Sequence, residues 1–370
     1  MGVTPSLTLT GARVFDGIGF SQGPLHVTQG KIGGPGGETT SLDGGILAPG
    51  FVDLQVNGGG GVMFCDFPCL ESLRLMTRAH LRLGATAILP TLISAPRADV
   101  ALAIEAVKQA ISEGLPGIAG LHLEGPHLAL PKKGAHDAAH IRPMQEEDLA
   151  MLCAAARDLP FLMVTLAPEA VSMDQIRVLA AAGAFVSLGH SDCSAGTAMT
   201  AREAGASCVT HLFNAMSQMS ARAPGLAGMA LARCDVMAGL ICDLIHVDPL
   251  TVQVALAARS EGLFLVSDAM AVAGTRHEGF SLNGREVSRR DGRLVLADGT
   301  LAGADLDLTQ ALRNLVSLDV PPERALAMAT SIPGKLIGAG HLHQGAPADM
   351  IWLDDKLHLR RVWRAGKEVI

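Results

Sequence analysis

The chain has 370 residues, of which 49% are hydrophobic and 18% are charged, and its formal net charge is −7. This composition is that of a folded protein with a large apolar core, and it excludes a mainly disordered chain. The mild negative charge excludes attachment to nucleic acid through a broad positive field, so we expect no nucleic-acid partner.

The first 48 residues are predicted to form short strands. The segments SLTLTGARVFDG and PLHVTQGKIGG are both short and both end in glycine-rich turns, as strands of a small β-sheet commonly do. This part of the chain lacks the long stretches rich in Ala and Leu that begin after about residue 49.

From about residue 49 the pattern changes to short apolar runs that alternate with longer stretches rich in Ala and Leu. Such runs, separated by amphipathic helices, indicate parallel strands that are buried on both faces. Eight units of this kind predict an α/β protein with a TIM-like (β/α)8 barrel; a doubly wound open sheet is the alternative. The predicted strands are GFVDLQVNG, ATAILPTLI, GIAGLHLEG, FLMVTLAPE, AFVSLGHS, SCVTHLFNA, VMAGLICD and LFLVSDAM. The predicted helices between them are 71–83, 97–113, 145–157, 172–182, 194–204 and 249–261.

Beyond the eighth strand, residues 305–317 and 322–331 are predicted helices, and PADMIWLDD and LRRVWRAGKEVI return to strand character. The simplest explanation is that the two ends of the chain pair with each other. We therefore expect a small β-sandwich domain formed by residues 1–48 and 336–370, beside a catalytic barrel formed by residues 49–335.

Seven cysteines are scattered along the chain without a CxxC pair. We interpret them as reduced thiols of a cytoplasmic protein. No apolar run reaches the roughly 18 residues that a membrane-spanning helix needs, and the N-terminus lacks a basic region followed by an apolar one. We therefore expect neither a membrane partner nor a secretory signal.

Side chains that bind metals or transfer protons stand at the ends of five predicted strands. In (β/α)8 barrels the catalytic groups lie at the carboxyl ends of the strands, which share one mouth. A single strand-end histidine or carboxylate is more often a structural residue, but its repetition in successive units favours a shared site. The residues are Glu124, His190, His211, Asp243, His246 and Asp268.

Two imidazoles and one carboxylate suit a catalytic Zn²⁺-like ion that keeps one position for water. We expect Glu124, His190 and His211 to hold one divalent metal ion per subunit. Such an ion lowers the pKa of its bound water from about 15.7 toward about 7, which supplies a nucleophile at neutral pH. Asp268 is placed to accept the proton of that water and to pass it to the leaving group, so the set predicts amide hydrolysis.

The chain resembles the N-acetylglucosamine-6-phosphate deacetylases of the amidohydrolase superfamily along nearly its whole length. The motifs that carry the resemblance occur in one order: APGFVDLQVNGGGG, LHLEGPHL, KKGAH, SLGHSD, THLFNAM, PGLAG, HVDP, SDAM and GTLAG. The resemblance implies a TIM-like barrel with a small β domain built from both termini. It also implies release of acetate from the 2-acetamido group of a 6-phosphorylated amino sugar.

The resemblance assigns roles to single residues. It implies that Glu124, His190 and His211 are the metal ligands, that Asp268 is the catalytic acid and base, and that His136 of KKGAH contacts the carbonyl side of the substrate.

For the sugar phosphate, the resemblance implies contacts from Asn214 and Ala215 and a phosphate-binding pair made of Arg222 and His246. It further implies a homodimer in which the partner subunit completes the phosphate site. The residues whose backbone would line the sugar pocket are Leu301, Ala302 and Gly303.

The chain departs from many amidohydrolases at the end of the first barrel strand, where they carry His-x-His and hold a second metal. Here the same place has Gln55, Val56 and Asn57, and neither amide is a good Zn²⁺ ligand. We therefore expect a single ion. Zn²⁺ is the ion we expect, and Fe²⁺, Co²⁺ and Mn²⁺ are the alternatives. A second departure is CDLIH, in which Leu244 replaces the usual glycine and alters the turn that carries His246.

Two other functions stay open at this point. A related amidohydrolase would act on N-acetylgalactosamine 6-phosphate or on a cyclic amide, and a non-catalytic binding relative would keep the barrel without the reaction. The intact set of ligands together with Asp268 argues against the binding protein, because such a protein needs no positioned proton carrier.

Overall fold

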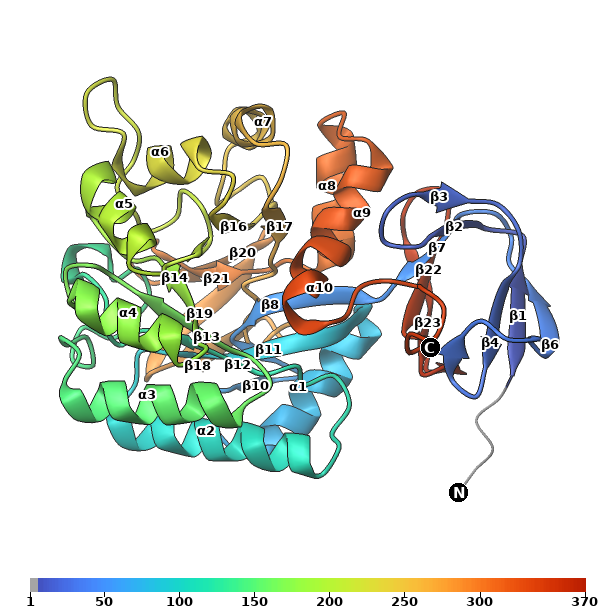
Figure 1. Ribbon diagram of the computed structural model, residues 1–370, viewed down its shortest axis with the longest axis horizontal. Helices are drawn as coiled ribbons and strands as arrows, with labels where there is room; N and C mark the ends of the chain where they lie inside the picture. The colour runs from blue at the N-terminus through green and yellow to red at the C-terminus, as the bar shows by residue number, and fades with distance from the viewer. Residues whose placement is uncertain (1–5) are drawn as a thin grey trace.

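The structure is a computed structural model of the chain and describes residues 6–370. At its centre, eight parallel strands curl into a nearly closed barrel, in which each strand pairs with the next one along the chain (Figure 1). Every residue of the first two barrel strands is buried, as the near-continuous apolar runs predicted. The strands are β8 (Phe51–Val56), β11 (Ala85–Ile93), β12 (Leu121–Glu124), β13 (Leu162–Leu166), β14 (Phe185–Leu188), β15 (Cys208–Val209), β16 (Met237–Leu240) and β17 (Leu263–Leu265).

The barrel closes between its first and last strands. Ala269, which follows β17, forms an isolated parallel bridge with Val56, and the backbone N–H of Asn57 donates to the carbonyl oxygen of Ala269 at 2.8 Å. Across the same seam, a carboxylate oxygen of the buried Asp53 accepts the backbone N–H of Ser267 at 3.2 Å. The predicted barrel is therefore confirmed, and the doubly wound open sheet is excluded.

Helices cover the outside of the barrel (Figure 1). One of them, α6, was not predicted, because nearly all of its residues are buried and its sequence has no polar face to reveal a helical period. The predicted helix 322–331 corresponds to α9, and a further helix that was not predicted, α10, begins directly after Thr330. The helices are α1 (Leu70–Arg82), α2 (Arg97–Ser112), α3 (Glu146–Asp158), α4 (Met173–Ala181), α5 (Ala195–Glu203), α6 (Gly225–Ala232), α7 (Pro249–Ala258), α8 (Leu308–Ser317), α9 (Pro322–Ala329) and α10 (Ser331–Ile337).

A four-stranded antiparallel sheet lies between the last barrel strand and α8, and it was also not predicted. It is joined to the barrel by a parallel bridge between Ala269 and Ala304. Its strands are β18 (Gly279–Leu282), β19 (Arg285–Arg290), β20 (Arg293–Leu296) and β21 (Leu301–Ala304). A short hairpin, β9 (Gly58–Gly59) with β10 (Val62–Met63), follows β8.

Two further sheets, built from both ends of the chain, lie to one side of the barrel (Figure 1). Strand β7 (Ile46–Pro49) pairs with β22 (Met350–Leu353), which joins the N-terminal and C-terminal segments, and one buried cluster holds Leu9 and Val27 of the first sheet with Trp363 of the second. The first sheet contains β1 (Leu7–Thr10), β4 (Leu25–Thr28), β5 (Lys31–Ile32) and β6 (Glu38–Ser41). The second contains β2 (Arg13–Phe15), β3 (Phe20–Ser21), β7, β22, β23 (Leu359–Arg364) and β24 (Lys367–Glu368).

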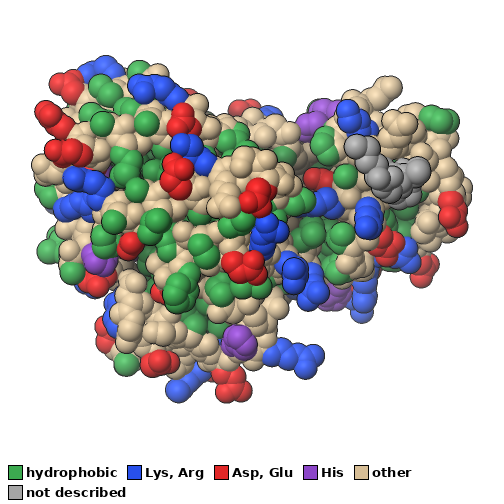
Figure 2. All heavy atoms as spheres, turned by 90° about the horizontal axis from the view of Figure 1, so that it is seen from below, with side chains coloured by type: hydrophobic (Ala, Val, Ile, Leu, Met, Phe, Trp, Pro, Cys, Tyr) green, Lys and Arg blue, Asp and Glu red, His purple; other side chains and the backbone are tan. Residues whose placement is uncertain are grey.

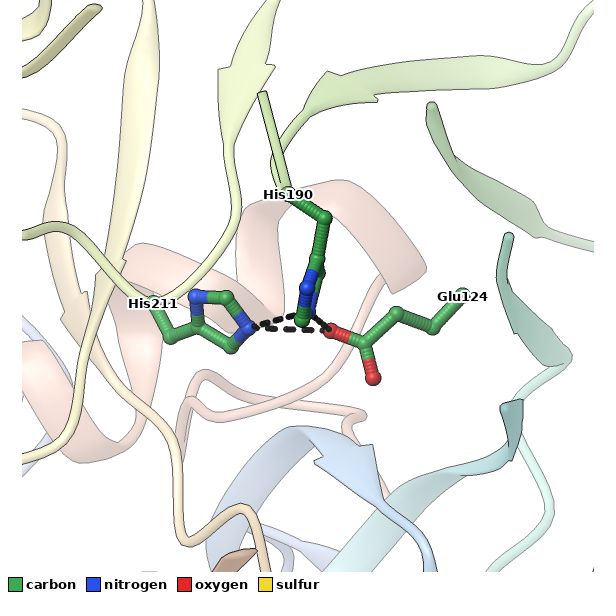
Figure 3. A group of neighbouring side chains, drawn as sticks. All are labelled: Glu124, His190 and His211. Carbon is green, nitrogen blue, oxygen red and sulfur yellow. Dashed lines mark hydrogen bonds and ion pairs between the residues drawn. The ribbon is translucent and has the colours of Figure 1, made fainter. Parts of the chain in front are cut away.

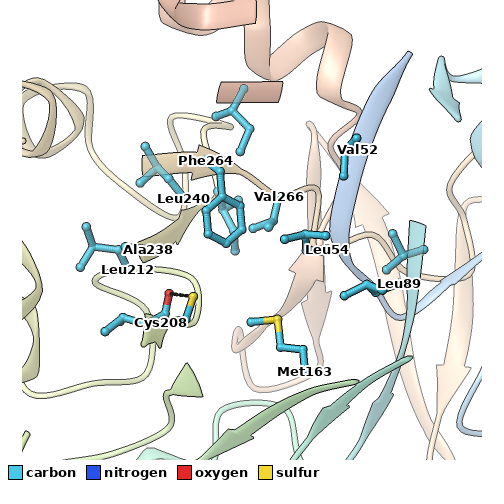
Figure 4. Close-up of a cluster of buried hydrophobic side chains, with 14 of the residues drawn as sticks. Val52, Leu54, Leu89, Met163, Cys208, Leu212, Ala238, Leu240, Phe264 and Val266 are labelled. Carbon is cyan, nitrogen blue, oxygen red and sulfur yellow. Dashed lines mark hydrogen bonds between the residues drawn. The ribbon is translucent and has the colours of Figure 1, made fainter. Parts of the chain in front are cut away.

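These sheets form the small β domain that was expected from both termini. We propose that it spans residues 1–48 and 336–370 and that the barrel domain spans 49–335; residues 1–5 lie outside the described part of the chain. The main apolar core lies in the barrel, where side chains such as Val52, Leu54 and Phe264 belong to one buried cluster (Figure 4).

Two chemical expectations can be compared with the described residues. All seven cysteines are free thiols, and no helix in the described region is long and apolar enough to cross a bilayer. On the face shown in Figure 2, acidic and basic side chains are interspersed.

Candidate metal centre

Three side chains from three barrel strands converge at the carboxyl end of the barrel (Figure 3). Glu124 is the last residue of β12, and His190 and His211 each stand two residues beyond the end of β14 and β15. The Nε2 atoms of His190 and His211 lie 3.3 Å and 3.0 Å from the same Oε1 atom of Glu124, and 3.0 Å from each other. All three side chains are buried. Among residues 6–370, this is the only group of three or more His, Cys, Asp or Glu donors spaced to hold an ion.

The surroundings of His190 show what this cluster requires. Nδ1 of His190 lies 2.7 Å from the carbonyl oxygen of Lys132, which can only accept, so Nδ1 carries a proton and Nε2 is the atom that faces the cluster. This atom lies close to Nε2 of His211 and to the carboxylate of Glu124, and such a group of lone-pair donors can approach so closely only around a shared proton or a cation. Donors about 2.0–2.2 Å from one tetrahedral ion lie roughly 3.3 Å apart, close to the observed separations. The residues therefore fit a divalent ion.

The backbone at the strand ends is strained in a consistent way. His190, His211 and Asp268 have φ angles of 48°, 29° and 49°, in the left-handed region that costs a non-glycine residue about 1–2 kcal/mol. Such conformations persist only where the surrounding structure enforces them, and they gather at functional sites. The turns that aim these side chains inward are therefore part of the site.

The two acidic residues of the site differ in their affinity for protons. Burial opposes ionisation of Glu124, but hydrogen bonds with His190 and His211 outweigh it and hold the pKa of this carboxyl well below its usual range. Burial and the negative charge of Glu124 raise the pKa of Asp268 to about 6. Glu124 is thus suited to bind an ion, and Asp268 is suited to exchange a proton near neutral pH.

Gln55 and Asn57 surround these carboxylates with amide donors. Nε2 of Gln55 donates to Oε1 of Glu124 and to Oδ1 of Asp268, both at 3.1 Å, and Nδ2 of Asn57 donates to the same Oδ1 at 2.7 Å. The sequence set these residues apart from the metal ligands, but it did not reveal that they donate hydrogen bonds to the two carboxylates.

His136 is buried and lies beside the cluster, with its Nε2 atom 3.8 Å from Oε2 of Glu124. The backbone N–H of Ser94 donates to Nδ1 of His136 at 3.2 Å, so Nδ1 is the acceptor and Nε2 of the neutral ring carries the proton. Burial and the neighbouring His190 lower the pKa of His136 to about 3, which keeps the ring neutral. This imidazole therefore presents a hydrogen-bond donor toward the cluster.

The cluster opens into a cavity of about 370 Å³. Most of the residues predicted for the site line this cavity, but Ala302 is buried behind it, and Arg222 lies in an exposed segment and is not among the lining residues. The predicted residues that line the cavity are Glu124, His136, His190, His211, Asn214, Ala215, His246, Asp268, Leu301 and Gly303.

His246 reaches the cavity from a turn organised by Asp243. The carboxylate of Asp243 accepts the backbone N–H groups of Ile245 and His246 at 2.9 Å and 2.8 Å, and its Oδ2 lies 2.6 Å from Nδ1 of His246. Leu244 adopts φ 63° within this turn, so the leucine takes the left-handed conformation that a glycine would occupy without strain.

The sequence did not indicate several residues of the cavity. Lys132 lines it and pairs with Asp192 at 3.1 Å. Leu282 and Thr300 enter from the unpredicted β18–β21 sheet and the turn before its last strand. The pairs Asn283-Gly284 and Asp291-Gly292, which join strands of this sheet, are two-residue hairpin signals that could have revealed it.

Comparisons with known proteins agree with this geometry. The sequence profile of the Amidohydrolase family matches residues 46–369. An N-acetylgalactosamine-6-phosphate deacetylase of Shewanella sp. (strain ANA-3) is 42% identical over 331 residues, which cover 88% of this chain and 84% of the relative. An N-acetylglucosamine-6-phosphate deacetylase of Haemophilus influenzae is 34% identical over 305 residues, which cover 81% of this chain and 79% of the relative. The crystal structure of N-acetylglucosamine-6-phosphate deacetylase from Pasteurella multocida has a TM-score of 0.93 at 31% identity and covers 98% of this chain and 99% of its own.

Proposed function

This chain belongs to the amidohydrolase family, and we propose that it hydrolyses N-acetyl-D-glucosamine 6-phosphate to D-glucosamine 6-phosphate and acetate. The observation that carries the proposal is the placement of Glu124, His190, His211 and Asp268 around one cavity at the carboxyl end of the barrel. Donors for a divalent ion beside a proton-exchanging carboxyl are suited to amide hydrolysis.

Glu124, His190 and His211 would hold the ion, for which we propose Zn²⁺, with Fe²⁺, Co²⁺ and Mn²⁺ as alternatives. When bound, the ion supplies Lewis acidity, which acidifies a water molecule and polarises the amide carbonyl. Because Gln55 and Asn57 present amides where a second set of ligands would be needed, we propose one ion per subunit.

Asp268 carries the proton during the reaction. Its Oδ1 atom already accepts from Gln55 and Asn57, while Oδ2 accepts no hydrogen bond within the described chain. Oδ2 is therefore the atom that takes a proton from the attacking water and hands it to the leaving nitrogen. With a pKa of about 6 the carboxyl is ionised at pH 7, so it begins the cycle as a base.

His136 stabilises the developing negative charge. Its Nε2–H, fixed by the contact of Nδ1 with Ser94, is free to donate to the acetamide carbonyl oxygen. A donor that is oriented before the reaction contributes more than one that must reorganise during it.

The sugar phosphate would bind at the end of the cavity that carries His246, which Asp243 orients. Asn214 and Ala215 line the same cavity, and Leu301 and Gly303 line its sugar side. We propose that Arg222 supplies a further cation, since a guanidinium fork suits a phosphate dianion.

We propose a homodimer in which the partner subunit completes the phosphate site. The exposed position of Arg222, away from the cavity of its own chain, supports an arrangement in which this side chain acts at a subunit boundary. The seven free thiols support a cytoplasmic location.

The second candidate substrate is N-acetylgalactosamine 6-phosphate. The Shewanella relative, whose name carries this sugar, shares more identical residues with the chain than the Haemophilus relative does. The two sugars differ only in the orientation of one hydroxyl group, so the same ligands and the same proton carrier would serve both.

Acetate release is the experiment that tests the proposal. The purified protein would be assayed on both phosphosugars, before and after treatment with a chelator and again after Zn²⁺ is restored. We expect metal-dependent release that is faster with N-acetylglucosamine 6-phosphate; faster release with the galactosamine substrate would favour the second candidate. No release from either sugar would contradict the deacetylase function and return attention to a cyclic amide or a non-catalytic role.

A further inference from the structure

A chain of buried polar side chains crosses the barrel directly beneath the metal ligands, and no step of the proposed mechanism uses it. Nε2 of His122 lies 2.7 Å from Oγ1 of Thr165, which lies 2.6 Å from Oγ1 of Thr210, which lies 2.6 Å from Oγ of Ser187. None of the four side chains is more than 1% exposed. We call His122, Thr165, Thr210 and Ser187 the buried relay.

One carbonyl group fixes the direction of every hydrogen bond in the buried relay. Nδ1 of His122 lies 3.1 Å from the carbonyl oxygen of Leu54, which can only accept, so Nδ1 carries the proton and Nε2 is an acceptor. Thr165 must then donate to His122, Thr210 to Thr165, and Ser187 to Thr210. Chains of hydrogen bonds that point in one direction polarise and strengthen one another.

The buried relay joins the strands that carry the ligands. His122 stands two residues before Glu124 on β12, Ser187 three residues before His190, and Thr210 directly before His211. Thr165 lies on β13, where it pairs in register with Glu124 on one side and with Ser187 on the other. Each ligand thus follows a relay residue of its own strand, and Thr165 joins His122 to Thr210, to which Ser187 is bonded in turn.

Two threonines of the buried relay pack closely against the backbone that precedes His190. Gly189, next to His190, has no room for a side chain, since a Cβ atom there would lie 2.9 Å from Cγ2 of Thr165 and 3.0 Å from Cβ of Thr210. The turn that carries His190 therefore packs directly against the threonines of the buried relay.

We propose that the buried relay presets the separation of Glu124, His190 and His211 before the ion binds, so that its residues are positioning residues for the metal centre. The inference rests on the proposed function in that it requires an ion at these three ligands. A relay that only stabilised the barrel would change its unfolding and leave its affinity for the ion unaltered.

The test is the Zn²⁺ affinity of the metal-free protein, measured by competition with a chromophoric chelator. Thr165→Val keeps the shape of the side chain and removes the central hydroxyl of the buried relay. We expect it to weaken Zn²⁺ binding about tenfold, at the lower end of the 10–100-fold losses typical of residues that orient metal ligands. Ser187→Ala, at the donor end, is a milder second variant should Thr165→Val not fold.

The matched control is Thr330→Val. Thr330 is fully buried and donates from Oγ1 to the carbonyl oxygen of Leu326 at 2.7 Å, at the end of α9 and away from the ligands. We expect this control to lose thermal stability but to bind Zn²⁺ within twofold of the unchanged protein. If Thr165→Val and Ser187→Ala also bind within twofold, the inference is overturned and the proposed function stands. If the unchanged protein binds no Zn²⁺, the proposed metal centre itself fails.

The direction of the hydrogen bonds in the buried relay can be measured independently in the unchanged protein. In ¹H–¹⁵N spectra of histidine-labelled protein, we expect His122 to show the tautomer with a proton on Nδ1, and we expect Thr165→Val to move its Nε2 resonance. A His122 ring protonated on Nε2 would reverse the hydrogen-bond order and overturn the buried relay as described.

Discussion

The side-chain amide of Asn57 donates a hydrogen bond of 2.7 Å to Oδ1 of Asp268. Because Gln55 donates to the same atom at 3.1 Å, one oxygen of this carboxylate is held by the end of β8 and the other faces the cavity. Two amides in a position where related enzymes carry histidines thus orient the group to which we assign proton transfer.

The substitution Asp268→Asn separates proton transfer from binding. The new side-chain amide would still accept from Asn57 through its own Oδ1 but has no basic oxygen, so we expect the turnover number to fall by about 10²–10⁴, the usual contribution of a general base. Acetate release and metal content would be measured on the same preparation. Near-normal turnover would refute the role of Asp268, and loss of the metal would show that the residue is a ligand.

The acid side of the pH profile should report the same group. Burial and the charge of Glu124 raise the pKa of Asp268 to about 6 in the metal-free chain, and a bound cation lowers it. The base works only when ionised, so we expect kcat/KM to fall as the pH drops through about 6 or below. Metal content measured at each pH controls for loss of the ion. A decline centred above pH 7 would point to a different group.

Histidines at positions 55 and 57 should create a second metal site. The double variant Gln55→His, Asn57→His places two imidazoles beside Glu124 and Asp268, where the amides now donate. We expect one Zn²⁺ per chain in the unchanged protein and two in the variant, measured by elemental analysis after equilibration and desalting. Two ions in the unchanged protein would show that the amides do not prevent a second site.

Asp53 makes the stability of the fold depend on pH. Burial raises the pKa of this carboxyl to about 7, whereas an unfolded Asp has a pKa of about 3.9. Between about pH 4 and pH 7 the folded state therefore binds more protons than the unfolded state does. Protonation of Asp53 stabilises the fold fully below about pH 4, and this stabilisation is lost as the pH rises through about 7. The free energy of unfolding would be measured with urea in the presence of EDTA. Because Asn does not ionise, we expect the stability of Asp53→Asn relative to the unchanged protein to increase with pH, by a few kcal/mol at most. A difference that is constant with pH would contradict this.

Most of the barrel could be predicted from the sequence because its strands are buried on both faces and its outer helices are amphipathic. Helix α6 could not, since its sequence GLAGMALA is apolar on all sides. Pro333 and Gly334 in α10 are residues that normally argue against a helix, and only the surrounding packing overrides them. The β18–β21 sheet was not predicted, although Asn-Gly and Asp-Gly pairs, which favour tight hairpin turns, join β18 to β19 and β19 to β20.

For the site, the strand-end positions of Glu124, His190 and His211 were enough to predict a shared centre, and the structure brings them together. The roles of Gln55 and His122 could not be predicted, because their contacts depend on which strands become neighbours. Arg222 illustrates the opposite case: a motif identifies it, but nothing in the sequence says which subunit's cavity it serves, and its role stays a prediction.

The most direct test of the account is the anomalous scattering of Zn²⁺ in crystals of the protein grown with one equivalent of the metal. We expect one peak per chain, bonded to Oε1 of Glu124 and to Nε2 of His190 and of His211 at the usual Zn²⁺ distances of about 2.0–2.2 Å. A peak located elsewhere, or none between these three atoms, would contradict the metal centre and the hydrolysis built on it.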